Sequence, residues 1–131
     1  MNRQARHLLI AGALLMALAT LLGAYGTHGL RNVLDERQFE TFRTAVQYQF
    51  FHALGVLAVG LIADRIVARS IVFAGWLLVL GIALFSGSLY AILGGAPSII
   101  GIVTPVGGLC LISGWLVIAI AIIRTRTTRP A

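Results

Sequence analysis

The side chains with the clearest chemical capacity in this sequence are His28 and His52, and Tyr48 precedes the second histidine by four residues. Residues four apart lie on one face of a helix, so the Tyr48 ring can stack on His52 or bond to it. A histidine of this kind in a membrane suits proton handling or ligand binding. The alternative is a buried imidazole satisfied by a neighbouring helix, with Gln47 and Gln49 forming hydrogen bonds between helices.

Hydroxyl groups supply the remaining candidates, which are Ser86, Ser88, Tyr90 and Thr104. Residues two apart point to different sides of a helix, so at most one of Ser86 and Ser88 can meet His52. No acidic residue is placed to orient that histidine as a catalytic triad requires. The sequence therefore favours serines that bond to backbone or to a neighbouring helix, and it does not favour an enzyme.

Metal or haem ligation needs facing ligands at matching depths. His52 falls about eight residues into its helix, which puts it ~12 Å deeper than His28 at the helical rise per residue. No carboxylate lies at that depth to assist, and Cys110 is the single cysteine. The sequence therefore predicts neither a metal site nor a cofactor.

Four apolar stretches position these side chains, at residues 8–27, 45–63, 71–95 and 99–123. The 131 residues are 59% hydrophobic and 11% charged, with a mean hydropathy of +0.95, whereas a soluble domain carries about 25% charged residues. Each stretch has about the 20 residues that cross a bilayer. We predict an all-α membrane protein, a bundle of four transmembrane helices that forms a single integral membrane domain over residues 1–131.

The polar residues gather at one end of each stretch, and a hairpin topology brings those ends to one depth. The resulting polar layer comprises His28, Tyr48, Gln49, His52, Ser86, Tyr90 and Thr104. Polar groups are costly in hydrocarbon, so the layer forms either a packed network or a small cavity. The opposite halves of two stretches, 54–63 and 71–80, hold no polar side chain, which argues against a pore through one chain.

The net charge of +6 comes from ten arginines and no lysine. Three arginines lie on the side of the polar layer, offset by Asp35, Glu36 and Glu40. On the opposite side lie seven: Arg3, Arg6, Arg65, Arg69, Arg124, Arg126 and Arg129. The positive-inside bias then predicts a multi-pass protein of the bacterial inner membrane with both termini cytoplasmic, and the charge gives no reason to expect nucleic acid as a partner.

A helical segment precedes the second span. Asp35 and Gln38 have the spacing of a capping box. From Phe39 onward, apolar residues recur every three or four positions, and Glu40 can pair with Arg43. We expect an amphipathic segment of about ten residues at the outer interface, either as a simple connector or as a lid over the polar layer. The chain enters the membrane near residue 44, and one long helix through both parts is possible.

Two features bear on helix packing. Small residues recur every fourth position in the third span, at Ala83, Gly87, Ala91 and Gly95, which permits close contact within the bundle, with a second copy or with another membrane protein. In the fourth span, Pro105 cannot bond to the carbonyl of Gly101, so we expect a kink or partial unwinding there.

Four ordered motifs resemble the family called domain of unknown function 423, which includes the eukaryotic transmembrane protein 256. They are residues 23–30 (GAYGTHGL), 44–49 (TAVQYQ) with 52–54 (HAL), 85–90 (FSGSLY), and 104–108 (TPVGG) with 114–115 (GW). Tyr25 and Thr27 depart mildly from the family pattern. The resemblance implies a small bacterial inner-membrane protein of about four helices, and it implies no activity.

The leading hypothesis is a structural or interaction protein whose polar layer is a packing network or a binding surface. The runner-up is an outward-facing protein that binds a small ligand or assists transport, using the layer around His28, Tyr48 and His52. A membrane enzyme comes third.

Overall fold

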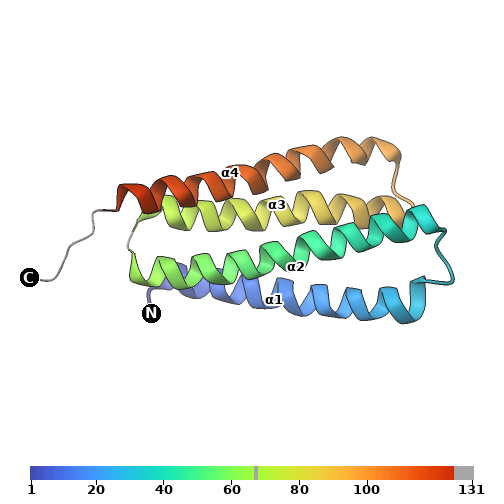
Figure 1. Cartoon of the computed structure of the whole chain (residues 1–131), viewed down its shortest axis with the longest axis horizontal. Coiled ribbons are helices and arrows are strands. Elements are labelled where there is room, and N and C mark those ends of the chain that lie inside the picture. The colour runs from blue at the N-terminus through green and yellow to red at the C-terminus, as the bar shows by residue number, and fades with distance from the viewer. Residues whose placement is uncertain (67, 126–131) are drawn as a thin grey trace, which may run out of the picture.

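The computed structural model describes residues 1–66 and 68–125 and shows four long helices joined as successive hairpins (Figure 1). α1 (Arg3–Tyr25) continues into a π-helical turn, η1 (Gly26–Leu30). α2 (Glu36–Arg65) and α3 (Arg69–Leu93) follow, and a 3₁₀ turn, η2 (Ser98–Ile102), leads into α4 (Val103–Arg124). Each of the four helical units is long and apolar enough to span a membrane.

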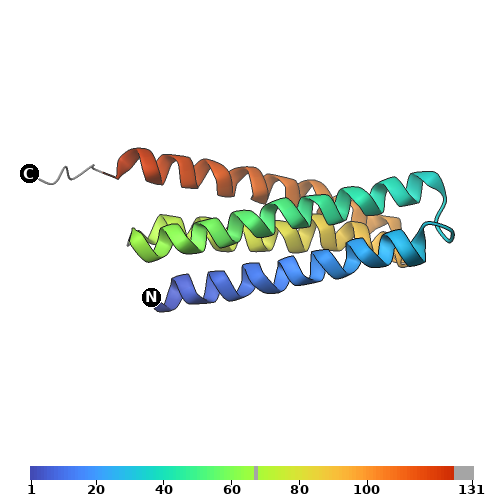
Figure 2. The same cartoon turned by 60° about the horizontal axis from the view of Figure 1, so that its bottom comes forward.

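Each helix packs chiefly on its neighbours in chain order, with a smaller contact between α1 and α3. α1 and α4 are accordingly the outer helices in both Figure 1 and Figure 2. The N-terminus, the α2–α3 connection and the end of α4 lie at one end of the bundle, while η1 and η2 lie at the other (Figure 1). The predicted hairpin order is confirmed. Arg126 and Arg129, which entered the charge count, fall outside the described residues.

The apolar core fills the half of the bundle nearer the N-terminus. Its largest fully buried side chains come from the three helices that pack in series, and they are Leu8, Val56, Val59, Ile71 and Leu78. A buried aliphatic side chain has no polar atom to satisfy, so this half needs only close packing between helices.

The start of α1 is fastened to the end of α2. The side-chain oxygen of Asn2 caps α1 by accepting from the Ala5 amide at 2.8 Å. Its Nδ2 donates to the Ala63 carbonyl at 2.7 Å, and its backbone N–H donates to Asp64 at 2.8 Å. One residue thus satisfies groups on two helices.

α3 and α4 approach closely at glycines of both helices, Gly107 and Gly114 of α4 and Gly81 of α3, which faces Leu111. A side chain at Gly107 would collide with the backbone of α3 at Phe85, and one at Gly114 would meet Leu78 at 2.8 Å. The absence of a Cβ therefore sets the separation of these two helices. The small-residue stripe of α3 does not make this contact, because Ala83 is exposed and the space beside Gly87 is open. Gly95, the last member of that stripe, lies beyond α3 with a φ of +94°.

The amphipathic segment after η1 is not a separate element. Residues 36–44 form the first turns of α2, which runs unbroken to Arg65, so the long-helix alternative is the one observed. The capping box is confirmed. The Gln38 amide donates to the Asp35 carboxylate at 2.8 Å, and the Asp35 amide donates to the Gln38 side chain at 3.1 Å. Arg43 and Glu40 also pair as expected, at 2.7 Å.

The expected kink at Pro105 is misplaced. α4 is α-helical from Val103, so Pro105 lies in its first turn, where a backbone N–H has no intrahelical partner to lose. The irregular backbone is η2, which ends at Ile102, before the proline.

Candidate functional site

Gln49 lies at the centre of the polar layer and joins three helices. Its side chain, which is 1% exposed, donates from Nε2 to the carbonyl of Leu15 in α1 at 2.9 Å. Its Oε1 accepts from the hydroxyl of Tyr90 in α3 at 2.8 Å. The Tyr90 ring also packs against Phe42, with centroids 5.9 Å apart. The predicted hydrogen bonding between helices is confirmed at this residue.

Serine hydroxyls extend the network toward α4. Ser86 donates to the carbonyl of Ala45 in α2 at 2.7 Å, and it is as buried as Gln49. Ser88 donates to the carbonyl of Phe85 in its own helix at 2.9 Å. Its oxygen lies 2.7 Å from the Thr104 hydroxyl, which therefore donates to it across the α3–α4 contact.

His52 is held by its own helix and by aromatic neighbours. Its Nδ1 lies 2.7 Å from the Tyr48 carbonyl, and because a carbonyl oxygen only accepts, Nδ1 carries the proton. The Tyr48 ring stacks on His52 with centroids 5.6 Å apart, as the spacing predicts, and on Phe85 at 4.4 Å. The Trp115 ring of α4 also lies near His52, with ring centroids 6.3 Å apart. Phe85 and Trp115 lie in the family motifs, but sequence reasoning did not assign them to the site, because an apolar residue type does not indicate contact with a histidine.

His28 is the candidate that the fold leaves outside the network. It lies in η1, at the outermost turn of the first helical unit, and its side chain is exposed. The expected depth difference between the two histidines is therefore realised. Within the described residues, no three His, Cys, Asp or Glu side chains gather where they could hold a metal ion.

The buried part of the layer satisfies its own hydrogen bonds. Among the described residues, no buried side-chain nitrogen or oxygen lacks a hydrogen-bond partner. The polar side chains that the fold brings together are Tyr48, Gln49, His52, Ser86, Ser88, Tyr90 and Thr104. Gln49, Ser86 and Thr104 bond to other helices, whereas His52 bonds within its own helix and Tyr48 is 42% exposed. Ser86 points its hydroxyl at a carbonyl instead of at His52.

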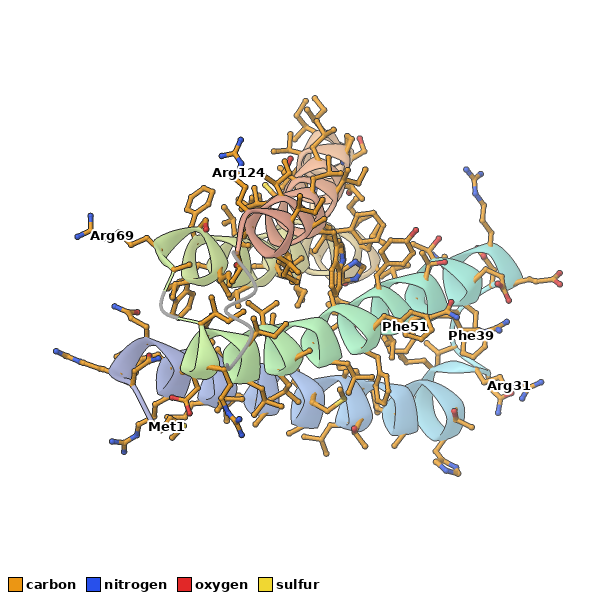
Figure 3. All side chains as sticks on the ribbon, turned by 60° about the vertical axis from the view of Figure 1, so that its left-hand side comes forward. Met1, Arg31, Phe39, Phe51, Arg69 and Arg124 are labelled. Carbon is orange, nitrogen blue, oxygen red and sulfur yellow. The ribbon has the colours of Figure 1, made fainter. Side chains whose placement is uncertain are left out.

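A cavity of about 480 Å³ lies beside this network, between the end of the first helical unit and the first half of α2. Figure 3 shows Arg31 and Phe39 near its mouth, with Phe51 further along α2. Its walls combine two arginines with a group of phenylalanines, and the lining residues are Gly23, Gly26, Thr27, Arg31, Phe39, Phe42, Arg43, Val46, Gln47, Phe50 and Phe51. Four of these residues, Phe39, Phe42, Val46 and Phe50, lie on the apolar face that the sequence indicated, but only the fold places α1 opposite them.

Comparison with known proteins now places the chain. The sequence model of the family described as "Protein of unknown function (DUF423)" matches residues 22–108, which include the network and the cavity. The chain belongs to the DUF423 family. The resemblance drawn from the four motifs is thereby confirmed.

Relatives of this DUF423 protein carry the name UPF0382 membrane protein. YwdK of Bacillus subtilis is 41% identical over 117 residues, which cover 88% of this chain and 95% of the relative. A Staphylococcus epidermidis protein is 41% identical over 88% of this chain and 94% of its own length. A Haemophilus influenzae protein is 42% identical over 75% and 78%. No solved structure matches the chain.

The relatives are named membrane proteins, and the four helices of this DUF423 protein are long and apolar enough to span a membrane. The chain is a multi-pass integral membrane protein with an all-α bundle. The glycines that set its close contacts, Gly26 against Phe42 and Gly107 against Phe85, both lie inside the matched segment.

Proposed function

We propose that this protein has a structural or interaction role in the bacterial inner membrane, with its polar layer acting as a dry packing network. The observation that carries the proposal is Gln49, which is 1% exposed and uses both ends of its amide to hold two other helices. An unpaired amide in hydrocarbon is costly, so a layer that satisfies itself favours one arrangement of the bundle.

A small-ligand or transport-associated site in the same layer has less support. Such a site needs donors or acceptors that are free to meet a ligand. The Gln49 and Ser86 donors point to backbone carbonyls, and His52 uses Nδ1 within its own helix. The candidates that remain for that role are Tyr48, which is 42% exposed, and His28, which is exposed and lies outside the network.

The proposed orientation places both termini in the cytoplasm and the polar layer in the outer leaflet. Five arginines and a single acid, Asp64, lie at one end of the bundle among the described residues, and these arginines are Arg3, Arg6, Arg65, Arg69 and Arg124. Figure 3 shows Arg69 and Arg124 at the opposite end from Arg31. The positive-inside bias assigns the arginine-rich end to the cytoplasm.

An interaction role needs a surface that the bundle leaves free. The α3 face that carries Ala83 and Gly87 meets this need, because Ala83 is exposed and nothing lies within 4 Å of a side chain placed at Gly87. Small residues at such a face let another helix approach closely. We propose that a second copy of this chain packs against this face.

Cysteine labelling tests the dryness and the orientation together. Cys110 is replaced first, and single cysteines are then placed at Ser86 in the network, at Val33 in the α1–α2 connection and at Ser70 near the start of α3. A membrane-impermeant thiol reagent is added to intact cells and then to permeabilised ones. We expect Val33→Cys to react in intact cells, Ser70→Cys only after permeabilisation, and Ser86→Cys in neither.

The labelling of each variant tests a different part of the proposal. Rapid labelling of Ser86→Cys in folded protein contradicts the dry network and moves the ligand-binding alternative to the front. Labelling of Ser70→Cys in intact cells, with Val33→Cys protected, reverses the orientation instead.

A further inference from the structure

The cavity between η1 and α2 has a charged mouth. Arg31 follows η1 directly and is exposed, and Arg43 is the eighth residue of α2. Arg43 pairs with Glu40, but the two side chains are 64% and 61% exposed. An exposed pair of this kind contributes little to stability, and a guanidinium has five N–H donors, so Arg43 can bond a second anion.

The inner part of the cavity is apolar and aromatic. Phe42, Phe50 and Phe51 line it together with Val46, and Gln47 is the polar residue among them. Phe51 lies eight residues beyond Arg43 in α2, which is about 12 Å further along the axis. Its ring is 58% exposed, on a helix that crosses the membrane. The cavity therefore runs from the interfacial arginines to the depth of the acyl chains.

The opposite wall, from the first helical unit, contains two glycines beside Thr27 and Arg31. Gly23 and Gly26 contribute no side chain, and a Cβ at Gly26 would collide with the Phe42 ring. A second hollow of about 360 Å³ shares Arg31, Phe39 and Arg43 with the mouth and adds Glu36 and Glu40. Those carboxylates can accept hydrogen bonds from hydroxyl groups next to a bound phosphate.

We propose that this cavity binds one anionic glycerophospholipid with a polyol head group, of the phosphatidylglycerol class. The phosphate lies between Arg31 and Arg43, the head-group hydroxyls face Glu36 and Glu40, and one acyl chain follows the phenylalanines. A free phosphate would leave the aromatic wall unused. A choline head group has no O–H to donate to Glu36 or Glu40. This site shares no hydrogen-bonded side chain with the packing network and touches it where Phe42 packs on Tyr90.

Native mass spectrometry of the full-length protein in detergent tests the proposal, with phosphatidylglycerol and phosphatidylcholine of identical chains as probes. We expect about tenfold tighter binding of phosphatidylglycerol, because both lipids offer a phosphate to the arginines but only the glycerol head group donates O–H bonds to Glu36 and Glu40. Replacing both Arg31 and Arg43 by Gln should weaken phosphatidylglycerol binding, because it removes the contacts to the phosphate. Arg37→Gln is the matched control, because Arg37 is exposed at the same end but lines neither hollow.

A second pair of variants tests the acyl chain. Phe51→Ala should weaken phosphatidylglycerol binding, while Phe73→Ala should not, since Phe73 of α3 is 59% exposed and lies outside the cavity. Glycerol 1-phosphate, which has the head group without chains, should compete poorly.

Three results would overturn the proposal. The first is equal binding of the two lipids by the unsubstituted protein. The second is an Arg37→Gln loss that matches the double substitution, which would indicate non-specific charge attraction. The third is full competition by glycerol 1-phosphate, which would indicate a simple phosphate site.

Discussion

The hydroxyl of Tyr90 donates a 2.8 Å hydrogen bond to Oε1 of Gln49, and this bond links α3 to α2 inside the bundle. The same amide reaches Leu15 in α1, so a single side chain sets the relative positions of three helices. Tyr90 is therefore part of the packing network, although its residue type suggested a ligand-binding role.

Gln49→Leu should lower the free energy of unfolding by about 1–2 kcal/mol, since it leaves the Leu15 carbonyl and the Tyr90 hydroxyl without their partner. Unfolding by SDS in mixed micelles measures the change. Gln47→Leu is the matched control, because Gln47 is exposed on the same helix. Equal losses from the two substitutions would contradict the bridging role.

Tyr90→Phe should cost about 1 kcal/mol, because it removes one bond and leaves the Gln49 oxygen unpaired. The double substitution with Gln49→Leu should cost less than the sum of the two single losses, since both remove the same bond. Tyr25→Phe, at an exposed tyrosine, should have no effect. Strict additivity in this cycle would show that the two side chains do not interact.

Gly107→Ala should destabilise the α3–α4 contact by about 2 kcal/mol, because the added methyl group meets the backbone of α3 at Phe85, which cannot move aside as a side chain can. Gly108→Ala should be neutral or slightly stabilising, since its nearest neighbour is the Phe85 ring at 3.8 Å. The same unfolding assay compares the two. If Gly108→Ala is the more harmful change, the helix register in the structure is wrong.

Asn2→Ala should cost about 1–2 kcal/mol, because it removes the cap on α1 and the hydrogen bond to the Ala63 carbonyl. Gln4→Ala, at an exposed position in the first turn, is the comparison. Thermal unfolding in detergent should show a lower Tm for Asn2→Ala alone. An unchanged Tm would mean that the fastening between α1 and α2 does not form.

The depth of each polar residue was predictable from sequence, but the rotation of each helix about its axis was not. Span lengths follow from apolar composition, so Gln49, Ser86 and Tyr90 were expected at one level. Which face meets a neighbour depends on packing across helices. The spacing of Ala83 and Gly87 marks a small-residue face, yet the bundle uses Gly107 for its closest contact.

The other differences also have local physical causes. Pro105 was expected to distort a helix that had already begun, but the preceding 3₁₀ turn delays the start of α4 until the proline falls in its first turn. The cavity joins η1 to residues of α2 that were recognised only as an amphipathic face. A periodic pattern shows that a helix face is apolar, but it does not show which part of that face the neighbouring helices leave uncovered.

The packing of each helix on the one before it has a consequence for biosynthesis. A ribosome delivers the helices in order, so α2 meets α1 in the membrane before α3 is made. At that stage the Gln49 amide already has a carbonyl to bond to in Leu15, and only its oxygen still lacks the Tyr90 hydroxyl. Assembly can therefore follow translation, with each hairpin ready to receive the next helix as it leaves the insertion machinery.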